Sequence, residues 1–307
     1  MKPITIIGNG ALGLLFAAFF AAKNIKVQII TRQKTSATKI NKGGISLTNL
    51  SNGVINYNDN IYATTDYNQL NPSDIVIILT KSYSTEETIK KNLKFLKKTK
   101  TILTLQNGLG NIEILESYLI DNNIIAGTTS IGATAIDSNK TKYCGKGMVD
   151  IANVNNNKDG NDILKNLSEL FVKCGVKCNI HNNWETVIWS KLYVNAIINP
   201  ITALYKITNG EIIENPKFKK LAKQSSDEIL KILKTKKIDI QLEKPFDKIL
   251  EICKITSNNK SSMLQDILNN KQTEIEQITG EIIRIAKEAE IETPINSMLY
   301  EKLTMVK

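Results

Sequence analysis

The chain has 307 residues, 42% of them hydrophobic, and its formal net charge is +10 at pH 7. This length suggests two globular domains of roughly 150 residues each. Such a basic charge can indicate nucleic-acid binding, but the lysines are spread along the chain, and the one dense run at 94–100 is typical of a solvated helix end. We therefore expect no nucleic-acid partner, and the charge favours anionic small molecules instead.

Cysteine and histidine usage narrows the class further. The four cysteines form no Cys-x-x-Cys pair and His181 is the single histidine, so we expect no metal site. Reduced thiols are typical of a cytoplasmic protein, which is the location we expect. The apolar stretch at 11–22 resembles a signal-peptide core but is too short to span a bilayer. Because a strand pattern and a glycine motif precede it, we predict a buried first helix and no membrane partner.

The first half of the chain alternates short apolar runs with helical stretches. The run at 74–79 is continuously apolar, as a buried parallel strand requires. This alternation predicts an α/β fold with a Rossmann-like, doubly wound sheet. The predicted strands lie at 4–7, 26–30, 74–79, 102–105 and 124–126, and the predicted helices at 11–23 and 84–96.

The pattern changes in the second half. Residues 145–153 are strand-like without a crossover helix, and a helix at 162–174 is expected to close the first domain. From Trp184 onward nearly every segment has helical spacing. We therefore predict a Rossmann-like domain at 1–183 and an all-helical domain at 184–307. The predicted helices of the second domain lie at 184–198, 216–233, 245–253, 262–268 and 273–289, with a short last helix from 294.

A glycine motif directly follows the first strand and opens the first helix. Its first glycine permits a tight turn, its second lets the backbone approach a pyrophosphate, and its third allows close helix–strand packing. Phosphates would meet the N–H groups and the positive dipole at the helix start. The motif therefore predicts a dinucleotide site, with an ordinary glycine turn as the alternative. The predicted cofactor-binding residues of this turn are Gly8, Asn9, Gly10, Ala11, Leu12 and Gly13.

The end of the second strand distinguishes the two nicotinamide dinucleotides. An NAD site needs a carboxylate there for the ribose 2′-hydroxyl, but this segment reads Thr31-Arg32-Gln33-Lys34. The guanidinium of Arg32 suits a 2′-phosphate. We therefore predict NADP(H) as the cofactor, with a plain surface arginine as the alternative.

Two more loops follow strand ends, at the sheet edge where ligands bind in such folds. Lys81 in the first loop could reach a phosphate or a carboxylate. Asn107 in the second could hydrogen-bond the nicotinamide ribose or the substrate. A solvated loop lysine and a simple Asn-Gly turn remain open as alternatives.

One helix of the second half carries a polar stripe. Lys191, Asn195 and Asn199 stand four residues apart, so each step turns only about 40° and the three share a face. A polar stripe on a buried helix costs stability unless each group finds a partner, and a bound polar substrate would be such a partner. The alternative is an amphipathic helix whose polar face meets water.

Capping offers a competing explanation for the last motif. Ser261 or Ser262 could cap a helix, and Thr273 with Glu276 fits a capping box. From spacing alone, capping is favoured over catalysis. Gly280 inside the following helix indicates close packing there.

Taken together, these motifs resemble the ketopantoate reductase (2-dehydropantoate 2-reductase) family, in order from residue 4 to about residue 294. The resemblance implies an N-terminal Rossmann domain, a helical C-terminal domain and an active site in the cleft. It implies hydride transfer from NADPH to the 2-keto group of ketopantoate, which gives (R)-pantoate for pantothenate and coenzyme A synthesis.

The resemblance also implies roles for individual residues. Lys191 resembles the proton donor, and Glu274 the acidic residue that helps hold substrate and cofactor ribose. Asn107 resembles a residue that touches both ligands, and Lys81 and Ala133 resemble cofactor contacts. Further residues resemble substrate ligands: Asn195, Asn199, Asn209, Asn259 and Ser262.

The sequence departs from the family at two points and leaves three alternatives. Asn9 stands where the family often has a small residue, and Gln33 and Lys34 follow Arg32, so the details of 2′-phosphate binding stay open. A reductase of another branched 2-keto acid could use the same machinery. A 3-hydroxy-acid dehydrogenase would share the Lys-x-x-x-Asn helix, but the Ser262 segment argues against it.

A non-catalytic NADP(H)-sensing protein is the third alternative. It would keep the glycine turn but need not keep Lys191 with Glu274. The sequence does not determine the oligomeric state, and a homodimer is the assembly that we consider.

Overall fold

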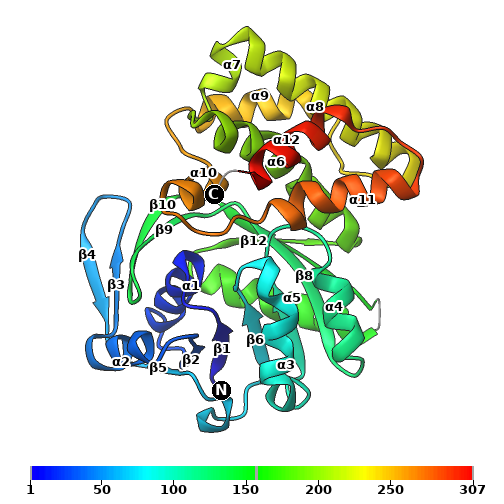
Figure 1. Ribbon diagram of the computed structural model, residues 1–307. Coiled ribbons are helices and arrows are strands. Elements are labelled where there is room, and N and C mark those ends of the chain that lie inside the picture. The colour runs from blue at the N-terminus through cyan, green and yellow to red at the C-terminus, as the bar shows by residue number, and fades with distance from the viewer. Residues whose placement is uncertain (1, 156–157, 306–307) are drawn as a thin grey trace. The chain divides into compact units, whose positions relative to one another are not determined.

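The structure, a computed structural model, describes residues 2–155 and 158–305. The chain forms two compact units. The N-terminal unit holds the blue to green strands of Figure 1, and the C-terminal unit is built of helices in green to red. The N-terminal unit comprises Met1–Gln106 and Asn111–Val187, and the C-terminal unit comprises Asn107–Gly110 and Ile188–Lys307.

An eight-stranded sheet forms the centre of the described N-terminal unit. All its neighbouring strands are parallel except β8 and β11, which run antiparallel. In spatial order, the strands are β12 (Lys177–His181), β11 (Met148–Asn153), β8 (Asn123–Thr129), β7 (Thr101–Thr104), β6 (Ile75–Ile78), β1 (Ile4–Ile7), β2 (Val27–Ile30) and β5 (Ile61–Thr64).

The order of these strands creates a switch point. The chain first proceeds from β1 to β2 on one side, and it later places β6 on the other side of β1. Right-handed crossovers in opposite directions put helices on both faces of the sheet, so the predicted doubly wound topology is confirmed. In such sheets ligands bind outside the carboxyl ends of the strands at the switch point, which here lies between β1 and β6.

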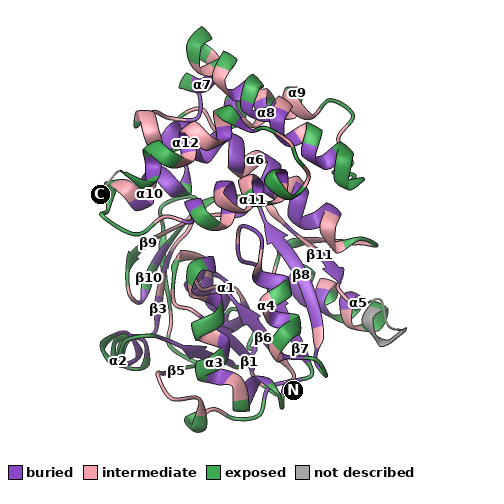
Figure 2. Ribbon diagram, turned by 45° about the vertical axis from the view of Figure 1, so that its right-hand side comes forward, coloured by how far each residue is buried: buried purple, intermediate pink, exposed green. Residues whose placement is uncertain are grey.

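Helices α1 and α5 share the hydrophobic core of this unit. The Phe171 ring of α5 lies 5.6 Å from the ring of Phe16 and 6.0 Å from that of Phe20, both in α1. The apolar stretch at 11–22 therefore forms a buried helix, as predicted, and the purple strands of Figure 2 are buried as well. The helices of this unit are α1 (Ala11–Ala21), α2 (Lys34–Gly43), α3 (Thr85–Leu96), α4 (Asn111–Tyr118) and α5 (Lys158–Lys173), with short 3-10 turns η1 (Tyr67–Gln69) and η2 (Ser82–Ser84).

A second, four-stranded sheet was not predicted. Its strands are short and mix apolar with polar residues, and β4 is largely exposed, so the sequence lacks the continuous apolar signal of the main sheet. The edge strand β12 was missed for a related reason, because its residues are only partly buried. In spatial order, the second sheet contains β4 (Val54–Tyr57), β3 (Ile45–Thr48), β10 (Lys140–Gly145) and β9 (Gly132–Asp137).

The C-terminal unit consists of helices, as predicted. Contacts assign the first turn of α6 to the N-terminal unit and the helix from Ile188 onward to the C-terminal unit. In the described part of the chain, no helix has both the length and the apolar character needed to cross a membrane. The helices are α6 (Trp184–Tyr205), α7 (Glu211–Glu214), α8 (Pro216–Lys236), α9 (Pro245–Ile255), α10 (Ser262–Leu268), the π-helix η3 (Glu276–Gly280), α11 (Glu281–Glu288) and α12 (Pro294–Thr304).

Helix α6 is longer than predicted, because it continues through Pro200 to Tyr205. Proline lacks the N–H that would bond the carbonyl four residues earlier. The Thr202 hydroxyl lies 2.8 Å from the carbonyl oxygen of Ile198 and adds a side-chain bond in this turn. Ile197 and Ile201 are fully buried on either side of the proline, so packing retains the helix where propensity alone would end it.

Candidate active site

The predicted glycine turn lies at the switch point of the main sheet. A Cβ atom on Gly8 would stand 2.9 Å from the Leu79 carbonyl, at the end of β6, and Gly8 has a φ of +114°. A Cβ atom on Gly13 would lie 2.0 Å from the carbonyl oxygen of Gly8. Packing within the protein therefore requires glycine at both positions.

Gly10 differs from its two neighbours in the motif. A Cβ atom there would meet nothing within 4 Å, so the protein's own packing does not require glycine. Gly10 is the N-cap residue of α1, which has no side-chain cap and no acidic residue in its first turn. Exposed backbone N–H groups at an uncapped helix start fit the phosphates of a dinucleotide. The close approach of a ligand would explain the glycine at this position.

Asn9 has a structural partner. Its Nδ2 donates to the carbonyl oxygen of Ser138, in the turn between β9 and β10, at 3.1 Å. The same hairpin contacts the helix start, where the Thr141 hydroxyl donates to the carbonyl of Ala11 at 3.0 Å. The departure from the family at Asn9 thus ties the glycine turn to the second sheet.

The other predicted cofactor residues lie in the same unit. Arg32 is exposed just beyond β2, and no carboxylate stands between that strand and the first turn of α2. Lys81 follows β6 and is half-buried at the start of η2. Ala133 lies in β9 and packs against the hydrophobic core. Leu12 is also half-buried against this core.

The C-terminal unit brings together residues from three distant parts of the chain. Asn195 in α6 donates from Nδ2 to the Oδ1 atom of Asn107 at 3.3 Å. Asn107 donates from its own Nδ2 to the Oε2 atom of Glu274 at 3.2 Å. Glu274 is only 5% exposed. Lys191 precedes Asn195 by one turn on the same helix and is half-buried.

Asn199 completes the stripe on α6 and is 5% exposed. Its Nδ2 atom is buried and has no hydrogen-bond partner within the protein. A buried amide left without a partner costs about 1–3 kcal/mol. This finding contradicts the alternative of a polar helix face open to water, at least at this position. The orphaned donor fits an oxygen atom of a bound ligand.

Asn209 and Asn259 are joined through the backbone. The Asn209 N–H donates to the carbonyl of Asn259 at 3.0 Å, and the Asn209 Nδ2 donates to the Thr256 hydroxyl at 2.9 Å. The Oδ1 atom of Asn209 is buried without a partner, whereas Asn259 itself is exposed. The structure thus places one predicted substrate ligand in a buried position and the other at the surface.

The serine pair divides its roles. Ser261 is the N-cap of α10, because its hydroxyl accepts from the N–H of Leu264 at 3.2 Å, and the same hydroxyl lies 2.7 Å from the hydroxyl of Thr202. Ser262 is exposed in the first turn of the helix. The capping interpretation therefore applies to Ser261 and leaves the hydroxyl of Ser262 available for a ligand.

The segment after Glu274 is a π-helix, where a single α-helix was predicted. The expected capping box does not form, because the Glu276 carboxylate accepts from the Tyr300 hydroxyl at 2.5 Å. A Cβ atom on Gly280 would meet that carboxylate at 2.8 Å, which confirms the close packing expected there. π-helical turns often occur at functional sites.

The loop of Asn107 docks onto this π-helix. The Leu109 N–H donates to the carbonyl of Gln277 at 2.9 Å. Gly108 has a φ of +80°, and a Cβ atom there would lie 2.5 Å from the same carbonyl oxygen. The Asn-Gly turn therefore has a packing role that holds Asn107 in place.

Sequence reasoning missed Gln106, which directly precedes Asn107 and is 5% exposed. Its amide bonds to Thr80, Thr85 and Thr104. The only signal in the sequence was a glutamine directly after an apolar strand, and that signal is weak.

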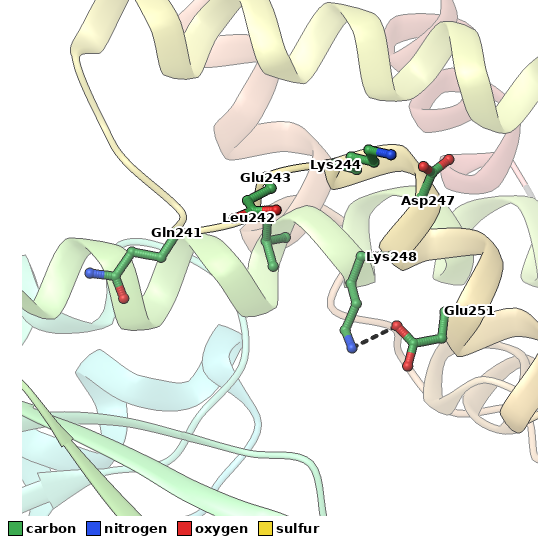
Figure 3. Close-up of a pocket in the computed structure, with 7 residues that line it drawn as sticks. All are labelled: Gln241, Leu242, Glu243, Lys244, Asp247, Lys248 and Glu251. Atoms are coloured by element: carbon green, nitrogen blue, oxygen red, sulfur yellow. Dashed lines mark hydrogen bonds and ion pairs between the residues drawn. The ribbon is translucent and has the colours of Figure 1, made fainter.

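A pocket on the C-terminal unit lies among other residues. Figure 3 shows that its side chains are largely charged and that Lys248 pairs with Glu251 at 2.9 Å. None of the predicted site residues lines it. Within the described residues, no cluster of His, Cys, Asp and Glu is arranged to hold a metal ion. The pocket is lined by Gln241, Leu242, Glu243, Lys244, Asp247, Lys248 and Glu251.

Comparison with known proteins places this geometry in a family. The family model "Ketopantoate reductase PanE/ApbA" matches residues 4–156, and its C-terminal counterpart matches residues 183–307. A 2-dehydropantoate 2-reductase of Archaeoglobus fulgidus is 30% identical over 299 residues, which cover 97% of this chain and 96% of that protein. A 2-dehydropantoate 2-reductase of Listeria innocua is 33% identical over 300 residues, covering 97% and 94%.

Solved structures share the fold. A 2-dehydropantoate 2-reductase from Geobacter metallireducens superposes with a TM-score of 0.89 at 22% identity, covering 99% of this chain and 100% of that one. A D-mandelate dehydrogenase with NADH and anilino(oxo)acetate gives a TM-score of 0.88 at 22% identity, covering 98% and 97%. At such identities the likeness concerns the fold alone, whereas the family models and the curated relatives span nearly the whole chain. The chain belongs to the ketopantoate reductase family of nicotinamide-dependent oxidoreductases.

Proposed function

We propose that this protein reduces ketopantoate to (R)-pantoate with NADPH, a step of pantothenate and coenzyme A synthesis. In this proposal residues 1–183 bind the cofactor and residues 184–307 bind the substrate and supply the proton. The observation that carries the proposal is the buried, unpartnered Nδ2 atom of Asn199, one turn along α6 from Asn195 and two from Lys191. A keto acid supplies the oxygen acceptors that such an amide donor lacks.

The residues of the N-terminal unit fit a dinucleotide. The space beside Gly10 is open, and the uncapped start of α1 offers backbone donors for the pyrophosphate. Lys81 would add a positive charge after β6. The exposed Arg32, with no carboxylate near it in sequence, supports binding of a 2′-phosphate. When bound, the reduced nicotinamide supplies the hydride.

Lys191 would supply the proton. A lysine ammonium ordinarily stays protonated at neutral pH, so its Nζ can donate to the keto oxygen as negative charge develops there. The same positive charge stabilises the developing alkoxide.

Asn107 and Asn195 would orient the substrate next to Lys191. Their amides already bond each other, and Asn107 bonds the Glu274 carboxylate. Glu274 would help hold the substrate and the cofactor ribose. Asn209, Asn259 and Ser262 would complete the set of substrate contacts.

An NADPH-oxidation assay tests the proposal directly. Ketopantoate should be turned over with a higher kcat/KM than other branched 2-keto acids, and NADPH should be preferred to NADH. The panel includes 2-ketoisovalerate, which lacks the hydroxymethyl group of ketopantoate, and benzoylformate, which replaces its branched chain with a ring. A higher kcat/KM for another acid would keep the reaction class and overturn the substrate. NADPH binding without turnover of any acid would favour a sensing role instead.

A further inference from the structure

Three parts of the N-terminal unit meet at one buried hydroxyl. Thr85 is the first residue of α3 and is 1% exposed. Its Oγ1 accepts from the Nε2 atom of Gln106 at 2.8 Å. The same Oγ1 lies 2.7 Å from the Oδ1 atom of Asn111 and 2.9 Å from the Ser82 carbonyl oxygen, the two acceptors for its proton. One threonine hydroxyl thus acts as both donor and acceptor between two amide side chains.

The amide of Gln106 has a fixed orientation. Its Oε1 accepts from the Thr104 hydroxyl at 3.0 Å, so its Nε2 must point the other way, toward the carbonyl of Thr80 at 3.0 Å. This bond links the loop after β7 to the loop after β6, which contains Lys81. Buried networks in which every member has a partner rigidify their surroundings.

Thr85, Gln106 and Asn111 enclose the four-residue loop Asn107–Gly110, and we call these three residues the bracket. Gln106 precedes the loop and Asn111 follows it, and both side chains bond to Thr85. The loop belongs to the C-terminal unit, in which Asn107 bonds to Glu274 and Leu109 bonds to Gln277. Fixing both ends of so short a loop leaves its first residue little freedom.

We propose that Thr85 and Gln106 are positioning residues that set the location of Asn107 and, through Thr80, of Lys81. This inference rests on the proposed function, because it assigns to the bracket the task of presenting two ligand-binding side chains. Neither Thr85 nor Gln106 touches the reacting atoms. Their effect on turnover should therefore pass through Asn107.

A double-mutant cycle measures this dependence. Thr85→Val removes the hydroxyl with little change of shape, and Thr85→Ser keeps the hydroxyl. We expect Thr85→Val to lower kcat/KM about tenfold, Thr85→Ser to stay near wild type, and Thr85→Val to add little in an Asn107→Ala background. Thr5→Val is the matched control, because the buried Thr5 hydroxyl in β1 also accepts from a glutamine, Gln28 in β2, at 3.3 Å.

The outcomes distinguish a positioning role of the bracket from a general effect on protein stability. Thr5→Val should lower the melting temperature without changing kcat/KM. Equal losses from Thr85→Val with and without Asn107 would overturn the inference, as would a failure of Thr85→Ser to restore activity. A fully active Asn107→Ala variant would overturn both this inference and the proposed role of Asn107.

If the wild-type chain reduces no 2-keto acid, the proposed function fails, and NADPH binding still tests the bracket. Thr85→Val should then raise the Kd for NADPH, measured by fluorescence titration, because the Lys81 loop loses its anchor. Thr85→Ser should leave that Kd unchanged. An unchanged Kd in Thr85→Val would overturn the inference independently of turnover.

Discussion

The two units treat their buried polar side chains differently. In the N-terminal unit, the amide of Gln106 and the hydroxyl of Thr85 are fully engaged with each other and with their neighbours. Among the described residues, every buried side-chain polar atom without a partner lies in the C-terminal unit. These atoms are Asn199 Nδ2, Asn209 Oδ1, Gln277 Oε1 and Thr279 Oγ1.

In the proposed function, each unit presents its binding groups in a different way. The N-terminal unit holds its loops in shape with its own hydrogen bonds and offers backbone at the glycine turn. The C-terminal unit keeps buried donors and acceptors that the chain does not satisfy, each at a cost of about 1–3 kcal/mol. We therefore expect variants of the two units to differ in how they change the melting temperature relative to ligand binding and turnover.

The largest effect should come from Lys191→Ala in the C-terminal unit. Loss of a general acid typically costs 10²- to 10⁴-fold in rate, so kcat should fall by about a thousandfold. NADPH affinity, measured by fluorescence titration, should stay within about twofold, since the glycine turn is intact. Lys206→Ala, which removes an exposed lysine just beyond α6, is the control. Near-normal turnover of Lys191→Ala would remove Lys191 from the mechanism.

Two glycines of the same turn should respond differently to a methyl group. Gly13→Ala forces a Cβ atom to within 2.0 Å of the Gly8 carbonyl, so both the melting temperature and NADPH affinity should fall. Gly10→Ala meets nothing within 4 Å, so its melting temperature should match wild type. Its Kd for NADPH should rise about tenfold or more, as lost bonds to a charged phosphate predict. Unchanged NADPH affinity in Gly10→Ala would contradict the phosphate assignment.

Asn199→Leu should reverse the usual effect of a core polar mutation. Leucine has the same number of side-chain heavy atoms as asparagine and the same branching, and it removes the unpaired Nδ2, so the apo protein should melt at the same temperature or a few degrees higher. The KM for the keto acid should rise at least about tenfold, because a buried donor to a charged ligand is lost. A lower melting temperature with an unchanged KM would show that Asn199 serves the fold.

Arg32→Gln tests the choice of cofactor. Because Arg32 is exposed, the melting temperature should not change. The preference for NADPH over NADH, as a ratio of kcat/KM values, should fall about tenfold, the effect of one lost charge-assisted bond. Lys42→Gln, which removes an exposed lysine from the last turn of α2, is the control. An unchanged ratio in Arg32→Gln would place the 2′-phosphate elsewhere.

The smallest effect concerns alkaline stability. Burial raises the pKa of the Cys253 thiol from its ordinary value of about 9 to about 12. Below pH 9 both the folded and the unfolded state keep the proton, but between pH 9 and 12 only the unfolded state loses it. Stability should therefore fall as the pH rises through this window. The loss measured by thermal melting should be smaller in Cys253→Ala than in Cys144→Ala, which changes an exposed thiol.

The main sheet and the helical second half could be predicted because their signals are local. Strands such as 4–7 and 75–78 are continuous apolar runs, and helices such as α8 and α9 begin at Pro216 and Pro245, where proline is favoured. Strand β4 could not be predicted, since it is largely exposed and carries no apolar periodicity.

The candidate site shows the same limit. The sequence identified Asn107 and Asn195 as ligand-binding candidates, and the family resemblance added Glu274, but their mutual hydrogen bonds join segments 88 and 167 residues apart. The bracket around Thr85 depends on such non-local contacts as well. The sequence shows a threonine at the start of a helix, but it does not show that two amide side chains bond to it. The continuation of α6 past Pro200 reflects burial that only the tertiary structure reveals.

The π-helix after Glu274 has a consequence for how this region can change by insertion or deletion. A π-helical turn holds one residue more than the α-helical path between the same two points. Deleting a single residue within Glu276–Gly280 would let the segment return to α-helix, and the chain before it would then rotate by about 100° relative to α11. Glu274 would turn away from Asn107, although neither residue had been mutated. The deletion of a single codon would thus be enough to abolish this arrangement of polar groups.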